Sequence, residues 1–177
     1  MADIIHVADF FLVDAADDED DQFDAYRLHM LCVYAHVIML GYTGKPLCQE
    51  DIRMYDFGPA FPSLLEQYPL EKDLPKIDLE SDPEILWSYE DYLTKLETRV
   101  IELVEVTYGL LANWYIRERV KLDFKDFLSS RDIISKDDLK AKFHKFLLPL
   151  SKNTISLWDL GIYPTLHLNF RYRVRKK

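Results

Sequence analysis

The chain contains few of the residues that build covalent or phosphate-binding frameworks. Only two of its 177 residues are cysteines, Cys32 and Cys48, which excludes a disulfide scaffold and indicates a reducing compartment. With five glycines, the chain has no P-loop, no G-x-G-x-x-G and no G-x-S-x-G motif. These absences argue against nucleotide-binding loops and serine nucleophile elbows, so we expect no cofactor.

Long hydrophobic runs are also missing. No stretch reaches the roughly 18–20 consecutive apolar residues that a helix needs to span a bilayer. The apolar segment Ile4–Val13 contains Asp9 and lacks both the basic leader and the small-residue cleavage site of a signal peptide. The sequence therefore predicts a cytoplasmic protein with no membrane partner.

The chain is rich in apolar and aromatic side chains, and its charge is unevenly distributed. Hydrophobic residues make up 49% and aromatic residues 14% of the sequence, enough for one sizeable core. The net charge is −9, with a dense acidic run at Asp14–Asp24 and a basic tail at Arg171–Lys177. We expect the acidic run to be a solvated loop, with a surface for a basic partner as the alternative.

Hydrophobic periodicity predicts a mainly α-helical fold. In the segment from Glu84 to Lys121, breaks are expected near Leu93–Thr94 and at Gly109. Its core stripe is expected to comprise Val100, Ile101, Leu103, Val104 and Thr107, continued by Leu110, Leu111, Trp114 and Tyr115. The predicted helices are Asp3–Ala16, Asp24–Leu40 (stopped by Gly41 and Gly44), Pro62–Tyr68, the interrupted segment Glu84–Lys121, and Lys136–Leu148 (ended by Pro149).

Two segments have strand patterns. Asp51–Phe57 is short and extended and enters a turn at Gly58-Pro59. Leu166–Val174 alternates apolar with polar or basic residues, so one face is apolar and the other basic. We predict a single compact helical domain at 1–150 with a small β element, followed by a C-terminal extension at 151–177 that carries the basic strand.

Three ordered blocks resemble the Panacea-domain proteins, which are SocA-like antitoxins. The blocks are Tyr26–His36 with Gly44-Lys45-Pro46-Leu47, Glu50–Pro59 with Phe61-Pro62-Ser63-Leu64, and Ile134–Phe143. The chain departs from the family pattern at Met30, Cys32 and Ala60, and Trp114–Asp123 replaces a family segment that does not align. The resemblance implies a non-catalytic antitoxin from a phage or mobile element, which neutralises a toxin or effector protein by direct contact.

Two groups of residues are candidates for binding a partner. Around the rigid Gly58-Pro59 pair, the candidates are Tyr55, Phe57, Gly58, Pro59 and Phe61, which either pack on the helices or line a partner groove. In the tail, the candidates are Arg171, Arg173 and Arg175. These arginines could contact phosphates of a nucleic acid. Alternatively, their strand could extend a sheet of a partner or of a second copy, or complete a sheet with Asp51–Phe57.

Histidines and cysteines raise a further alternative. His29, Cys32 and His36 share one helical face at i, i+3 and i+7, and Cys48 or a water could supply a fourth zinc ligand. A cysteine–histidine nucleophile pair would need an exposed thiolate. Because Cys32 occupies a core position, we predict no metal site and no catalytic residue. A dimer remains open.

Overall fold

The computed structural model describes residues 1–16, 23–77, 92–109, 111–128 and 132–152. They form a mainly helical fold with a small antiparallel sheet, as the sequence predicts. Two short helical segments, η1 (Glu105–Gly109, a π-helix) and η2 (Lys125–Phe127, a 3-10 helix), flank α6 in the chain. The helices and strands are α1 (Ile4–Ala15), α2 (Ala25–Thr43), β1 (Arg53–Tyr55), β2 (Gly58–Ala60), α3 (Pro62–Gln67), α5 (Lys95–Val104), α6 (Asn113–Asp123) and α7 (Lys136–Lys152).

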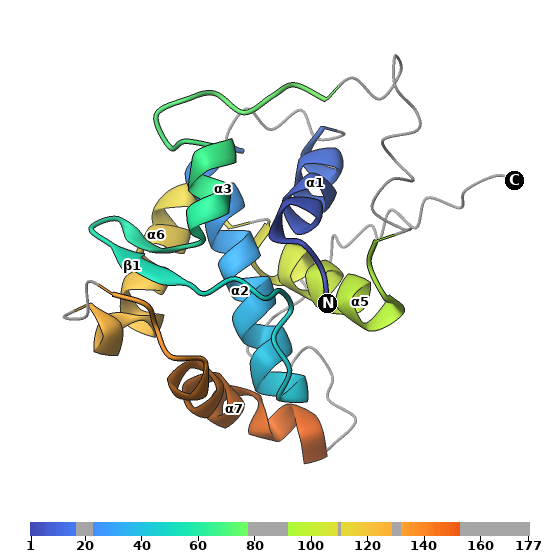
Figure 1. Ribbon diagram of the computed structural model, residues 1–177, viewed down its shortest axis with the longest axis vertical. Helices are drawn as coiled ribbons and strands as arrows, with labels where there is room; N and C mark the ends of the chain where they lie inside the picture. The colour runs from blue at the N-terminus through green and yellow to red at the C-terminus, as the bar shows by residue number, and fades with distance from the viewer. Residues whose placement is uncertain (17–22, 78–91, 110, 129–131, 153–177) are drawn as a thin grey trace, which may run out of the picture.

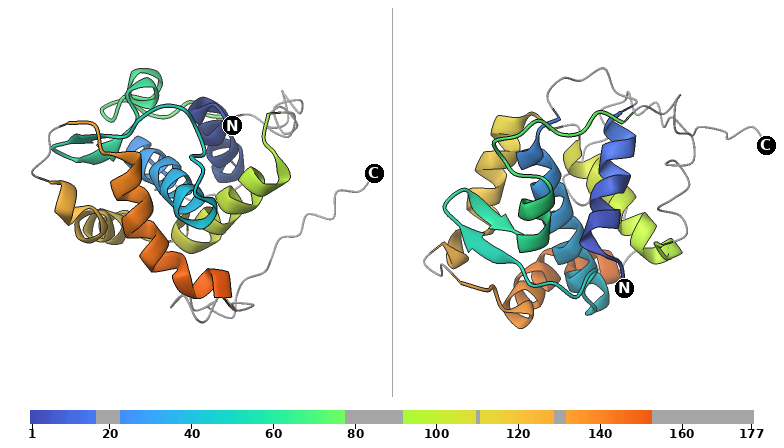
Figure 2. Two further views of the ribbon diagram at one scale, coloured as in Figure 1. Left: turned by 60° about the horizontal axis from the view of Figure 1, so that its bottom comes forward. Right: turned by 45° about the horizontal axis from the view of Figure 1, so that its top comes forward.

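Helix α2 is the centre of the fold, and the other elements pack around it (Figures 1 and 2). Every residue from Ala25 to Gly41 is buried, so this helix is enclosed on all sides. A helix in that position needs no polar face, which explains why its apolar residues form no single stripe. Neither α2 nor any other helix in the described part of the chain combines the length and hydropathy needed to cross a membrane.

The end of α2 lies beyond the predicted stop. The helix passes through Gly41 and ends at Gly44, whose φ of +73° is the left-handed conformation typical of a glycine cap. Burial of Gly41 among packed elements outweighs the cost of about 1 kcal/mol that glycine carries inside a helix. Only Gly44 therefore acts as the terminator.

Side-chain caps begin three of the helices. Asp3, Asp24 and Thr94 accept hydrogen bonds from backbone N–H groups at the starts of α1, α2 and α5. Asp24 also accepts a hydrogen bond from Asn113 Nδ2 at 3.2 Å, which ties the start of α2 to the start of α6. The last acid of the predicted loop is thus a structural cap, while residues 17–22 lie outside the described part.

The sheet differs in detail from the prediction. The turn falls at Asp56-Phe57, and Gly58-Pro59 belongs to β2, which pairs with β1 in the register Arg53–Ala60. Gly58 comes directly after the turn, and its φ of +133° is a backbone conformation that favours glycine. The predicted strand Asp51–Phe57 is therefore shorter than expected and forms half of a hairpin.

Residues 132–134 occupy the second edge of β1. Ile134 N–H donates to Ile52 O at 2.9 Å, and Met54 N–H donates to Asp132 O at 3.2 Å. Both edges of β1 are therefore paired, one with β2 and the other with residues 132–134. The predicted strand Leu166–Val174, with Arg171, Arg173 and Arg175, lies outside the described residues.

The segment from α5 to α6 confirms the predicted breaks but corrects the predicted core. Thr94 and Glu97 form a capping box at the start of α5, and the π-helix η1 ends at Gly109. Val100, Ile101 and Val104 are buried as expected. Trp114 and Tyr115, however, are exposed, because α6 buries only Ile116 and Val120 and turns its first residues outward. The first part of the predicted helical segment, 84–91, lies outside the described residues.

Helix α7 begins at Lys136 as predicted but does not end at Pro149. It continues to Lys152, so the predicted domain boundary at residue 150 falls within its last turn. Proline removes one N–H donor and clashes with the preceding turn, but its fixed φ of about −65° is helical. Proline is therefore tolerated in the last turn of a helix whose earlier turns are already formed.

Candidate protein-binding surface

The hairpin candidates divide into buried and surface residues. Gly58 and Pro59 are buried in β2, and Phe61 is fully buried in the core. Tyr55 and Phe57 are half-buried, and their rings stack at a centroid distance of 5.3 Å with planes 9° apart. Of the five predicted contact residues, Tyr55 and Phe57 are the ones whose side chains reach the surface.

Gly58 allows the hairpin to lie close to two helices. A β-carbon at this position would lie 3.4 Å from Val120 Cγ1 and 4.0 Å from the Tyr26 hydroxyl. The guanidinium of Arg117 lies 3.9 Å from the centre of the Tyr26 ring, a cation–π contact that covers the same junction. The hairpin therefore packs closely against α2 and α6 at Gly58.

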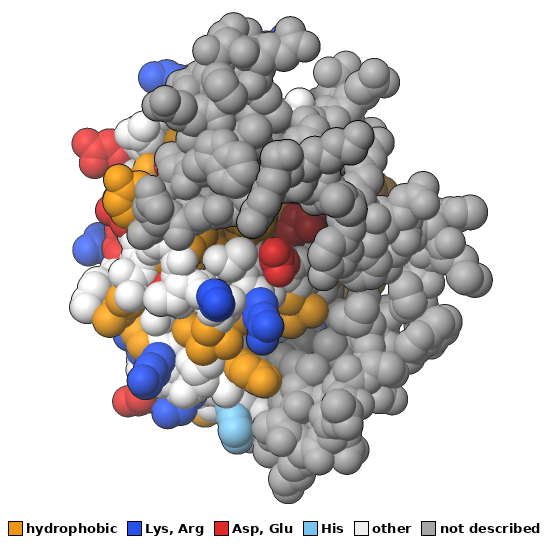
Figure 3. Space-filling model, turned by 90° about the vertical axis from the view of Figure 1, so that its right-hand side faces the viewer, with side chains coloured by type: hydrophobic (Ala, Val, Ile, Leu, Met, Phe, Trp, Pro, Cys, Tyr) orange, Lys and Arg blue, Asp and Glu red, His pale blue; other side chains and the backbone are white. Residues whose placement is uncertain are grey.

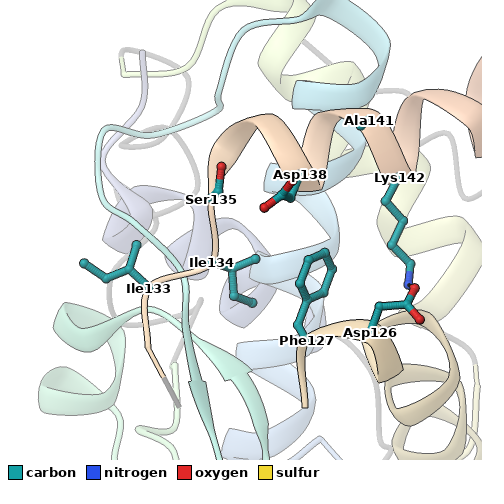
Figure 4. A pocket seen from close by; sticks show the side chains of 8 residues that line it. All are labelled: Asp126, Phe127, Ile133, Ile134, Ser135, Asp138, Ala141 and Lys142. Carbon is teal, nitrogen blue, oxygen red and sulfur yellow. Dashed lines mark hydrogen bonds and ion pairs between the residues drawn. The ribbon is translucent and has the colours of Figure 1, made fainter. Parts of the chain in front are cut away.

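An open pocket of about 700 Å³ lies between η2, residues 132–135 and the first half of α7 (Figure 4). We call it the α7 pocket. Figure 4 shows Phe127 and Ile134 in its middle, with Ser135 and Asp138 on one side and the Lys142–Asp126 pair on the other. Its lining residues are Asp126, Phe127, Ile133, Ile134, Ser135, Asp138, Ala141 and Lys142.

The α7 pocket combines an apolar middle with a charged rim. Lys142 Nζ lies 2.6 Å from Asp126 Oδ2 and 5.3 Å from the centre of the Phe127 ring. This ammonium lowers the pKa of Asp126, first through their hydrogen bond. Ile133 is 45% exposed at the edge, and the neighbouring Leu128 is also exposed. The site offers an apolar contact bounded by fixed charges.

Sequence reasoning missed the α7 pocket. The available signal was Ile133-Ile134, an apolar pair directly before the Ser135 that precedes α7. That pair marks an extended segment, but its pairing with β1 joins residues about eighty positions apart. Phe127 and Lys142 come from further separate elements, so only the tertiary fold brings the lining together.

The α2 residues considered as alternative zinc ligands, His29, Cys32 and His36, are all buried within the core. His29 Nε2 donates to the carbonyl oxygen of Tyr68 at 2.8 Å, and Cys48 Sγ lies 3.3 Å from His36 Nδ1. Cys32 is completely buried. No three His, Cys, Asp or Glu side chains of the described residues are arranged so that they could hold a metal ion.

Among the described residues, the Cys48–His36 pair is an arrangement of the kind that a nucleophile and a base would form. Burial raises the pKa of the Cys48 thiol to about 12 and lowers the pKa of the His36 imidazole to about 4. At neutral pH both groups are therefore uncharged, whereas a reactive cysteine needs a thiolate with access to substrate. In this geometry the pair serves as a buried hydrogen bond.

A second face, on the right-hand side of Figure 1, has a mixed surface. Figure 3 shows lysine and arginine side chains interspersed with hydrophobic ones over its described part. Helix α5 lies on this side and contributes exposed Lys95, Leu96 and Arg99. Such mixing is typical of a solvated surface, and this side of the molecule is the reference face for the variants of the α7 pocket.

No protein-family model, no curated protein and no solved structure matches this chain. The relation to Panacea-domain antitoxins therefore stays a prediction from the three motif blocks. In the structure these blocks form α2 with its glycine cap, the hairpin with α3, and the start of α7. All of them adjoin the buried centre of the fold.

Proposed function

We propose that this chain is a non-catalytic protein-binding domain that neutralises a toxin or effector by direct contact. The observation that supports this most is the α7 pocket, where Phe127, Ile133 and Ile134 form an apolar surface bounded by charges. Protein partners commonly anchor a side chain in such a hollow. The buried state of Cys48 and His36 speaks for the same non-catalytic role.

The charged groups around the α7 pocket would orient a bound partner and select one of matching charge. Asp126 and Lys142 neutralise each other across 2.6 Å, and Asp138 stands in the first turn of α7. An apolar anchor with a basic neighbour would satisfy both the Phe127 ring and the Asp138 carboxylate. The antitoxin role itself comes from the resemblance of Tyr26–His36 and its companion blocks to Panacea-domain proteins.

The first experiment is a matched pair of surface variants in affinity capture from the native host. Ile133→Asp places a charge at the edge of the α7 pocket, while Leu96→Asp changes a side chain of nearly equal exposure on the reference face, 45% against 43%. We expect the wild type and Leu96→Asp to retain one stoichiometric protein and Ile133→Asp to lose it, with binding weakened about thirtyfold or more.

The captured protein is then purified and recombined with the chain to show that the contact is direct. The product of the neighbouring reading frame is tested in the same way, because antitoxins of the family that this chain resembles are commonly encoded beside their toxins. Co-expression should restore growth inhibited by that product. Equal loss of the partner in both variants, or no stoichiometric partner at all, would count against the proposal.

A nucleic-acid-associated regulator is the second candidate, and it depends on Arg171, Arg173 and Arg175 of the basic tail. Phosphate contacts by these side chains would make binding strongly salt-dependent. Deletion of 166–177 should then abolish DNA or RNA retention at low salt. If the intact chain retains no nucleic acid at low salt, this candidate is removed without affecting the first.

A further inference from the structure

Helix α6 presents large apolar side chains to solvent at both of its ends. Trp114, at its start, is 69% exposed, and Leu122, near its end, is 63% exposed. Between them lie Glu118 and Lys121, whose charged atoms are 2.7 Å apart and well exposed. Positions 114, 118, 121 and 122 fall on one helical face, so these four side chains form a single surface, which we call the α6 face.

The side chains of the α6 face are not needed to attach this helix to the rest of the monomer. The helix is attached to the core by Ile116 and Val120, and to α2 by the Asn113–Asp24 hydrogen bond and the Arg117–Tyr26 contact. The rings of Trp114 and Tyr115 form an edge-to-face pair at a centroid distance of 5.7 Å, and Tyr115 is itself 43% exposed. A tryptophan left so open is a common anchor of protein interfaces.

The α6 face is complementary to itself when two copies meet antiparallel. The aromatic residue at the start of one helix then lies over the aliphatic residue near the end of the other, and this contact occurs twice. In this register position 118 of one copy lies opposite position 118 of the other, so the two Glu118 side chains meet at the two-fold axis, with Lys121 of each copy about one turn away. The two lysines thus offset the two glutamates at the axis, and the face carries no net charge that would repel its own image.

We propose that the α6 face is the contact surface of a homodimer with two-fold symmetry. Two-fold interfaces use the same patch on both copies, which is what a face with opposite charges inside and apolar ends provides. Helix α6 has 11 residues and is about 16 Å long. A contact of this size is small, so the dimer dissociates in the micromolar range. This inference does not depend on the α7 pocket or on the proposed function.

The association is measured by sedimentation velocity from about 1 to 200 µM, a range that brackets micromolar dissociation. The wild type should pass from monomer to dimer. Trp114→Ala should weaken the dimer about thirtyfold or more, while Tyr42→Ala, which removes an aromatic side chain 53% exposed on α2, should leave it unchanged. Circular dichroism checks that each variant keeps the wild-type helix content.

A charge exchange tests whether the two helices contact each other directly. Glu118→Lys gives a copy with two lysines on the α6 face, and Lys121→Glu gives a copy with two glutamates. Each variant alone should remain monomeric at concentrations where the wild type dimerises, because like charges oppose each other. Mixed in equal amounts, the two should form a heterodimer, since every lysine then meets a glutamate.

Three outcomes would overturn the proposal. The first is a wild type that stays monomeric throughout the concentration range. This outcome counts against the homodimer even if the α6 face binds a different protein. The second is a dimer that Trp114→Ala leaves intact, because the contact would then lie elsewhere. The third is a mixture of the two charge variants that associates no better than either alone.

Discussion

Cys48 Sγ lies 3.3 Å from His36 Nδ1 in the buried region between α2 and the segment that leads into β1. The imidazole also packs edge-on against the ring of Phe61 at a centroid distance of 5.3 Å. His36 Nε2 is buried with no hydrogen-bond partner among the described residues. The pair is thus held in an environment that strongly disfavours charge on either group.

Stability should fall as the pH drops from about 6.5 to about 4. Burial, with a smaller effect of the Lys136 ammonium, lowers the pKa of His36 to about 4 in the folded state, while the unfolded value is about 6.5. Between these values the unfolded chain binds the extra proton, so acid favours unfolding by roughly 3 kcal/mol. Urea denaturation at pH 7 and pH 5 measures the larger part of this loss, about 2 kcal/mol.

The control for this prediction substitutes the histidine and compares the same two pH values. His36→Gln should be less stable than the wild type at pH 7 but should lose less stability between pH 7 and pH 5. Part of the pH dependence of stability should remain in His36→Gln, because burial lowers the pKa of the His29 imidazole as well. Identical slopes in His36→Gln and the wild type would contradict the assignment.

Both thiols should resist modification while the chain is folded. Cys32 and Cys48 are buried, and burial raises the pKa of Cys48 to about 12, so almost no thiolate is present at pH 8. A thiol-reactive disulfide reagent should modify both residues only in denaturant. Rapid labelling of Cys48 in the native chain would show that the Cys48–His36 pair is accessible, and would reopen a catalytic role.

Tyr34 and Asp123 should contribute jointly to the attachment of α6. The Tyr34 hydroxyl donates to Asp123 Oδ2 at 3.0 Å, and Arg119 Nε donates to the same oxygen at 2.9 Å. Tyr34→Phe keeps the stacking on the Tyr108 ring but removes the hydroxyl, and should lower the free energy of unfolding by about 1–2 kcal/mol. A double-mutant cycle with Asp123→Asn measures the coupling, which should be clearly above zero.

Gly44 should be intolerant of a side chain. Its φ of +73° is costly for any residue with a β-carbon, and that atom would lie 3.1 Å from Lys140 Nζ. Gly44→Ala should therefore cost about 1–2 kcal/mol of stability, measured by thermal or urea unfolding. Gly109→Ala is the matched control, because its β-carbon would meet Glu105 at an ordinary 3.6 Å. Equal effects of the two substitutions would argue against the left-handed cap.

Local signals in the sequence were sufficient for most of the helices. Proline at the start of α3, the Thr94–Glu97 capping box and the break at Gly109 all act within a few residues, so their effect could be predicted without the fold. Helix ends were harder to predict. Gly41 and Pro149 both look like stops, yet burial of the one and the established helix before the other allow α2 and α7 to continue.

The sequence by itself determined that this protein is mainly helical, with a short strand next to Gly58 and a buried cysteine at position 32. Those features depend on spacing and on intrinsic preferences of single residues. The tertiary structure alone decided that Trp114 faces solvent, that residues 132–134 take the second edge of β1, and that Phe127 meets Lys142 in a pocket. Each of these depends on which distant segment covers which side chain, and contacts between remote elements leave no periodic pattern in the chain.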